Sequence, residues 1–190
     1  MPKLNINGMN LYYELHGSGH PLVLIAGFNC NTLLWTPILS ELQKYFQILI
    51  NAFKFHQQKN NLKIYSYVIL DNHFHIICSA EKLAQIFQSI KSFTARTIID
   101  ELKKENKTWL LHLLKFNKKS VKEESDFQLW QEGLHPKEIL NENILKQKIN
   151  YIHYNPVKRG YVLNEKDWKY SSARLYSSNE ECGVDITRLI

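Results

Sequence analysis

The chain has 190 residues, a hydrophobic content of 44% and a formal net charge of +6. This length favours one domain, or one domain with an appendage, and the composition is ordinary for a protein that buries a core. No segment approaches the roughly 20 apolar residues that a membrane-spanning helix needs, and the first residues show no signal peptide. The three cysteines are scattered and fit neither a metal site nor a disulfide framework, so we expect a cytoplasmic protein without a membrane partner.

The positive charge is confined to one part of the chain. Residues 1–47 hold two basic and two acidic side chains, so residues 48–190 carry the whole net charge of +6. A basic domain suits a polyanionic partner, because phosphate contacts release counterions. Many basic surfaces are merely solvated, so charge alone leaves nucleic acid and a bare basic surface as equal alternatives.

The first 47 residues are expected to form two strands and a helix. Residues 11–15 are a short strand candidate, and the apolar run 21–27 is typical of a buried strand before a helix. This segment resembles the opening of an α/β-hydrolase, in which the loop at Gly27 and Phe28 would form part of the oxyanion hole. No G-x-S-x-G nucleophile elbow follows, so we interpret it as structural and keep a hydrolase-like protein as a distant alternative.

A β-hairpin is the next predicted element. Residues 62–70 are rich in β-forming side chains, Asp71 and Asn72 are typical of a turn, and residues 73–78 form the second strand. Residues 46–58, just before the hairpin, are expected to continue the preceding helix.

Two further helices are predicted beyond the hairpin. A long amphipathic helix runs from residue 81 to about 104, and a second runs from residue 141 to about 154. A Lys-rich segment and an irregular stretch around Trp130 separate them. Since the residue before a proline is biased away from helix, Pro156 is expected to end the second helix.

Two histidines in the second strand are candidate metal ligands. Alternate side chains of a strand share a face, so His73 and His75 should point the same way while Phe74 points into the core. Two imidazoles at this spacing can hold one divalent metal with a third ligand and water. A bare H-x-H pattern is more often a pair of polar residues on the wet face of a sheet.

A tyrosine on the last helix is the candidate nucleophile. Apolar side chains at helical spacing form a buried stripe, and Tyr151 lies beside it on the same flank as Lys148. The ring can stay packed while the hydroxyl reaches solvent, which suits a nucleophile and equally suits an ordinary half-buried tyrosine. The stripe consists of Leu145, Ile149 and Ile152.

Five segments in order resemble motifs of the REP-associated tyrosine transposases, a branch of the single-tyrosine HUH transposases. Their order and spacing are far more specific than any one of them. They are the HUH strand pair at 67–77, K-x-F-T at 91–94, F-W-Q at 127–131, Y-I-x-x-N-P-V-x-x-G at 151–160 and D-W-x-Y-S-S at 167–173.

The resemblance implies a ferredoxin-like α+β domain, an antiparallel sheet with helices on one face. It implies that His73 and His75 bind magnesium or manganese, and that Tyr151 attacks a phosphate of single-stranded or hairpin DNA. The products would be a 5′-phosphotyrosine link and a free 3′-hydroxyl. Tyr154 is the reserve nucleophile, Lys148 is a candidate for helping the phenol ionise, and no third metal ligand is identified.

The basic residues expected to contact DNA are spread over the second part of the chain. They are Lys91, Arg96, Lys115, Lys118, Lys119, Lys148, Lys158 and Arg159.

The domain division follows from where the resemblance begins. Residues 48–190 resemble the transposases, and residues 1–47 stand where the family has its first strand, as in a fusion of two proteins. We expect residues 21–27 to replace that strand in the sheet that carries the histidines. An enzyme is the leading hypothesis, and a non-catalytic DNA-binding remnant is the alternative. A monomer and a homodimer are both compatible with the sequence.

Overall fold

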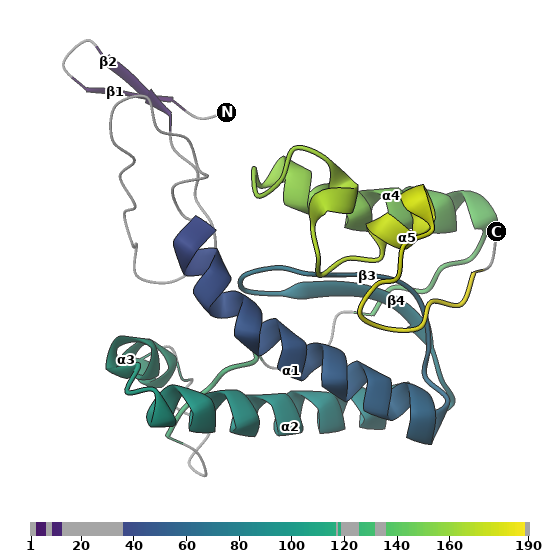
Figure 1. Cartoon of the computed structure of the whole chain (residues 1–190), viewed down its shortest axis with the longest axis horizontal. Helices are drawn as coiled ribbons and strands as arrows, with labels where there is room; N and C mark the ends of the chain where they lie inside the picture. Colours follow the sequence, from purple (N-terminus) through teal and green to yellow (C-terminus); the bar gives the residue numbers. More distant parts are fainter. Residues whose placement is uncertain are drawn as a thin grey trace.

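The computed structural model describes residues 3–6, 9–12, 36–116, 118, 126–131 and 136–188. These residues form an α+β architecture around a two-stranded antiparallel sheet (Figure 1). No helix among them is both long and apolar enough to cross a membrane. The elements in chain order are β1 (Lys3–Ile6), β2 (Met9–Tyr12), α1 (Thr36–Asn60), β3 (Lys63–Ile69), β4 (Phe74–Ser79), α2 (Leu83–Lys104), α3 (Thr108–Phe116), α4 (Glu142–Lys158), the 3-10 helix η2 (Glu165–Asp167) and α5 (Ala173–Ser178).

The predicted β-hairpin is confirmed as β3 and β4. The two strands pair antiparallel, with Val68 opposite His75 and Ile69 opposite Phe74. The backbone N–H of Leu70 donates to the carbonyl of His73 at 2.8 Å, which closes the turn between the strands. Residues 66–70 are each no more than 2% exposed, so β3 is buried on both faces.

Helices cover both faces of this hairpin, which corrects the expectation of helices on one face. On one side, the ring of Phe74 lies 5.6 Å from that of Phe53 in α1 and 6.3 Å from that of Phe87 in α2. On the other side, α4 packs on β3 (Figure 1). The reason is that consecutive side chains of β3, from Ser66 to Ile69, are buried, and a strand that is buried on both faces needs cover on both.

The segment after α4 covers the edge of β3 that β4 leaves open. The backbone N–H of Ile69 donates to the carbonyl of Tyr170 at 2.8 Å, and that of Ser172 donates to the carbonyl of Tyr67 at 3.0 Å. The indole N–H of Trp168 donates to the carbonyl of Ile69 at 2.8 Å. An uncovered edge would expose unpaired backbone groups, so the D-W-x-Y-S-S segment has a structural function here.

Only parts of residues 1–47 are described. β1 and β2 form a separate two-stranded sheet, and β2 overlaps the strand expected at residues 11–15. Residues 21–27, with Gly27 and Phe28, lie outside the described residues, and so does Lys119. α1 runs without a break through the expected boundary at 47/48. The domain division and the pairing of residues 21–27 stay predictions.

Helix α4 was expected to end before Pro156, but it continues to Lys158. Pro156 is fully buried, so tertiary packing outweighs the local preference against helix before proline. The end of α4 is a Schellman motif, in which the N–H of Gly160 donates to the carbonyl of Val157 and that of Tyr161 to the carbonyl of Pro156, both at 2.9 Å. Gly160 has a φ of 72°, which favours glycine.

We predict that Gly160→Ala lowers the free energy of unfolding by about 1–2 kcal/mol, because the left-handed backbone strains a residue with a Cβ. Urea unfolding followed by circular dichroism measures the change. Lys146→Ala, at an exposed position of the same helix, is the matched control. Equal stability of the two variants would contradict this account of the helix end.

Candidate active site

The two candidate metal ligands lie side by side at the start of β4. The ring centroids of His73 and His75 are 4.9 Å apart, with an interplanar angle of 85°. The Nδ1 atom of His73 lies 2.6 Å from the side-chain oxygen of Asn72. That oxygen only accepts hydrogen bonds, so in neutral His73 the proton is on Nδ1 and Nε2 keeps the lone pair that a metal needs.

Both imidazoles are held in the neutral form. Burial, together with the nearby Arg159 guanidinium and His75, lowers the pKa of His73 to about 4, against an opposing effect of Asp71. Burial and Arg159 also lower the pKa of His75. A metal binds the neutral ring, so both side chains are ready as ligands near pH 7.

Tyr151 comes from α4 to the same place. Its ring centroid lies 5.6 Å from that of His75, and the ammonium of Lys148 lies 5.9 Å from the centroid of the tyrosine ring. Tyr151 is 49% exposed, so about half of the residue is open to solvent. Tyr154 is equally exposed, but the aromatic contact that the structure describes for His75 on α4 is with Tyr151.

The orientation of α4 is set by a buried polar cluster. The Nε2 atom of His153 lies 2.8 Å from the hydroxyl of Ser172 and 3.2 Å from that of Ser66 in β3. The side-chain amide of Asn155 donates to the carbonyl of Tyr151 at 2.7 Å. The buried stripe predicted for this helix is confirmed, with Leu145, Ile149 and Ile152 all buried. With α4 held in this way, the ring of Tyr151 lies against that of His75.

The predicted DNA contacts fall into two groups on opposite sides of the β3–β4 hairpin. Lys148, Lys158 and Arg159 belong to α4 and its end. Lys91 and Arg96 on α2, with Lys115 on α3 and Lys118 just after it, lie on the other side (Figure 1). The histidine and tyrosine site is therefore associated with the first group alone.

Lys91 has a structural partner. Its ammonium donates to the carbonyl of Gln131 at 2.7 Å, and the indole N–H of Trp130 donates to the hydroxyl of Thr94 at 2.9 Å. The K-x-F-T and F-W-Q segments therefore contact each other, and they join α2 to the stretch that packs on Phe74.

Sequence reasoning missed one contact of the site. Arg159 pairs with Asp71 in the hairpin turn, with 3.1 Å between Nη1 and Oδ1. Nothing local in the sequence signals this pair, because its members are far apart along the chain. Among the described residues, no histidine, cysteine or carboxylate completes a cluster of three around the imidazoles.

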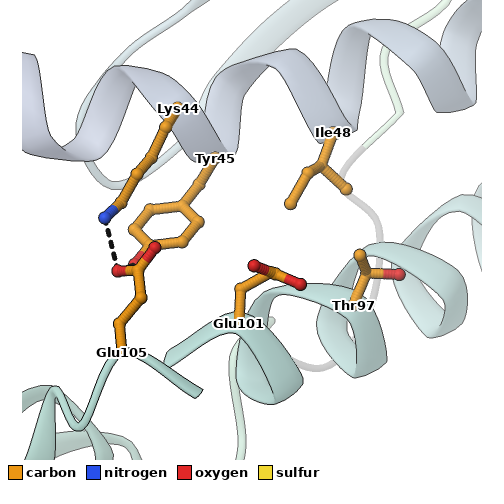
Figure 2. Close-up of a pocket in the computed structure, with 6 residues that line it drawn as sticks. All are labelled: Lys44, Tyr45, Ile48, Thr97, Glu101 and Glu105. Atoms are coloured by element: carbon orange, nitrogen blue, oxygen red, sulfur yellow. Dashed lines mark hydrogen bonds and ion pairs between the residues drawn. The ribbon is translucent and has the colours of Figure 1, made fainter. Parts of the chain in front are cut away.

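A separate hollow of about 280 Å³ lies between α1 and α2 (Figure 2). Glu101 and Glu105 line it, and Glu105 accepts hydrogen bonds from the Lys44 ammonium and the Tyr45 hydroxyl. It is on the side of the hairpin away from Tyr151, and its carboxylates would repel phosphate. It is therefore not a candidate for the active site.

We predict that His153 makes the fold less stable as the pH falls. Burial lowers the pKa of His153 to about 4, below the ordinary 6.5 of an unfolded chain. Between these values the unfolded chain binds a proton that the folded one does not, so stability is lost as the pH drops from about 6.5 to about 4, by on the order of 3 kcal/mol from this residue. His153→Gln should flatten the pH dependence of urea unfolding.

His73 and His75 act in the same direction, so part of the slope should remain in that variant. His112→Gln, at an exposed position, is the control. An unchanged slope in His153→Gln would show that the buried ring does not titrate in this range.

Comparison with known proteins gives two similarities, while models of protein families give no match. The chain is 27% identical over 104 residues to a chain described as a REP-associated tyrosine transposase of Haemophilus influenzae, covering 55% of this chain and 54% of that one. It thus spans about half the length of this relative. A solved structure of a REP-associated tyrosine transposase bound to a REP hairpin matches with a TM-score of 0.53 and 19% identity, over 79% of this chain and 78% of that one.

The sequence similarity is to a transposase, in agreement with the resemblance of residues 48–190, and the structural similarity shows a common fold. Neither comparison supports the hydrolase-like start expected for residues 1–47.

Proposed function

We propose that this chain cuts and rejoins hairpin or single-stranded DNA as a single-tyrosine transposase. The observation that carries the proposal is the contact between the rings of Tyr151 and His75, with His73 beside them. These residues come from the two segments that an HUH enzyme needs together, the histidine strand and the tyrosine helix. A packing role alone would not require a tyrosine that is half exposed beside two neutral imidazoles.

The choice of DNA rests on the comparisons and on charge. The structural neighbour is described as bound to a REP hairpin, which makes hairpin DNA the first substrate to test. Lys148 and Lys158 flank Tyr151 on α4 and are exposed, so they are placed to contact phosphates near the cut.

The donor set fits a divalent metal. We propose that His73 and His75 hold magnesium or manganese, with the remaining positions left to DNA oxygens and water. The metal would polarise the scissile phosphate as a Lewis acid. The chain's own contribution is to keep two neutral rings adjacent and to bring Tyr151 next to them.

The proposed chemistry is a reversible transesterification. The phenolic oxygen of Tyr151 forms a bond to the scissile phosphorus, and the bond from phosphorus to the 3′ oxygen breaks. The phenol proton passes to solvent, and the 3′ oxygen leaves with a proton as a free 3′-hydroxyl. Attack of a 3′-hydroxyl on the 5′-phosphotyrosine reverses these steps and rejoins DNA. The Lys148 ammonium stabilises the developing phenolate charge.

We predict that Tyr151→Phe abolishes a covalent protein–DNA adduct, lowering its rate of formation by at least about a thousandfold. The DNA is a hairpin oligonucleotide labelled at its 3′ end, incubated with manganese and run on a denaturing gel. Labelling this end keeps the label on the fragment joined to tyrosine. Hairpin binding should change little, since only the nucleophilic oxygen is removed.

Tyr154→Phe is the matched control and should retain the adduct. Loss of the adduct in Tyr154→Phe, with retention in Tyr151→Phe, would transfer the role to Tyr154. Firm hairpin binding by the unmutated chain without any adduct would favour a non-catalytic DNA-binding remnant.

We also predict that DNA binding weakens steeply with salt, and that the α4 face carries the dependence. Lys148→Gln with Lys158→Gln should reduce the log–log salt slope by about one unit per lost phosphate contact. Fluorescence anisotropy with a labelled hairpin at several salt concentrations measures it. Lys54→Gln controls for the loss of positive charge, because Lys54 is exposed on α1, on the other side of the β3–β4 hairpin of the protein. Equal slopes for the double variant and the control would place the DNA elsewhere.

A further inference from the structure

The hairpin turn and the end of α4 are joined by one ion pair. Asp71 lies in the turn between β3 and β4, two residues before His73, and Arg159 is the C-cap residue of α4. The distance from Nη1 of Arg159 to Oδ1 of Asp71 is 3.1 Å. The side chains are 18% and 27% exposed, so solvent screens this pair less than an ion pair on the open surface.

The pair is backed by packed aromatic side chains. Arg159 Nη1 lies 3.5 Å from the hydroxyl of Tyr161, and the rings of Tyr161 and Trp168 are 5.3 Å apart. Trp168 is itself bonded to the carbonyl of Ile69 in β3. Arg159 is therefore oriented from two sides, by the turn carboxylate and by a ring anchored on the central strand.

We propose that Asp71 and Arg159 form a latch, a positioning pair that holds the tyrosine helix against the histidine strand. The proposal rests on the proposed function, because it gives the pair a role in strand cleavage. The latch joins the two elements that bear the reacting groups, at the end of the hairpin where His73 lies. Arg159 then acts through the position of Tyr151, in place of the phosphate contact that its charge alone suggests.

The physical reason is that the reaction tolerates little displacement of the reacting groups from one another. His153 fastens the middle of α4 to β3, so α4 stays folded on the sheet without the latch. Among the described residues, no buried polar cluster of this kind links the turn before His73 to α4. The ion pair between Asp71 and Arg159 makes that link. A displacement of about 1 Å between reacting groups can cost a hundredfold in rate.

The test is a double-mutant cycle with Asp71→Asn, Arg159→Gln and both together. The readout is the single-turnover rate of adduct formation with a saturating hairpin, beside the Kd for the same hairpin. Each single variant should lower the saturated rate by about tenfold to a hundredfold, and the double variant should be no worse than either. The Kd of Asp71→Asn should stay within about threefold of the original, because this residue carries no positive charge for DNA.

Lys146→Gln is the matched control, because it breaks the 2.7 Å ion pair with Glu142 within α4 and leaves the hairpin turn untouched. Arg159→Lys, which keeps the charge, should restore part of the rate. Additive losses in the double variant, or an unaffected rate in Asp71→Asn, would overturn the latch and leave Arg159 as a direct DNA contact.

A second readout needs no activity. The rings of Tyr151 and His75 are close enough to give nuclear Overhauser effects between their protons in the DNA-free protein. These should weaken in Asp71→Asn and in Arg159→Gln but not in Lys146→Gln. If the unmutated chain forms no adduct and the effects still depend on the pair, the proposed function fails and the latch stands. If they are the same in all variants, the latch is wrong.

Discussion

The burial of β3 on both faces is the constraint on which the rest of the structure depends. Ser66, Tyr67 and Val68 are fully buried, with α1 and α2 packed on one side and α4 on the other. β4 occupies one edge of the strand, and residues 170–172 bond to the other. A strand enclosed in this way cannot shift its register without unpairing buried groups, so every element that touches it is fixed in position.

The candidate site is a consequence of this enclosure. The register places His75 opposite Val68, on the face that α4 covers, and turns Phe74 toward α1 and α2. His153 bonds to Ser66 on that same face, which sets the rotation of α4 and turns Tyr151 toward His75. Desolvation by the same packing keeps the imidazoles neutral. Core packing and site chemistry thus share one cause.

Local patterns in the sequence predicted the elements that local physics governs. The hairpin, the start of α4 at the Asn141 cap and the buried stripe of that helix all follow from turn chemistry and periodicity. Local patterns did not predict that α4 continues past Pro156 or that helices cover both faces of the β3–β4 hairpin. Both features depend on burial against distant parts of the chain. In β3 the apolar side chains do not alternate strictly with polar ones, and Tyr67, Val68 and Ile69 in succession signal cover on both faces.

The segment that begins at Tyr151 holds one proposed nucleophile and several groups that support its position. Asn155 bonds back to the carbonyl of Tyr151, Pro156 is buried, and Gly160 closes the helix in a Schellman motif. These residues would be kept by any chain that keeps the fold, whether or not it cuts DNA. The fold alone does not require a half-exposed phenol beside two imidazoles. Burial lowers the pKa of both imidazoles, so keeping them neutral lowers the stability of the folded chain in mild acid. That cost to stability is understandable where the arrangement serves a reaction, and it is the physical ground for preferring the enzyme to the remnant.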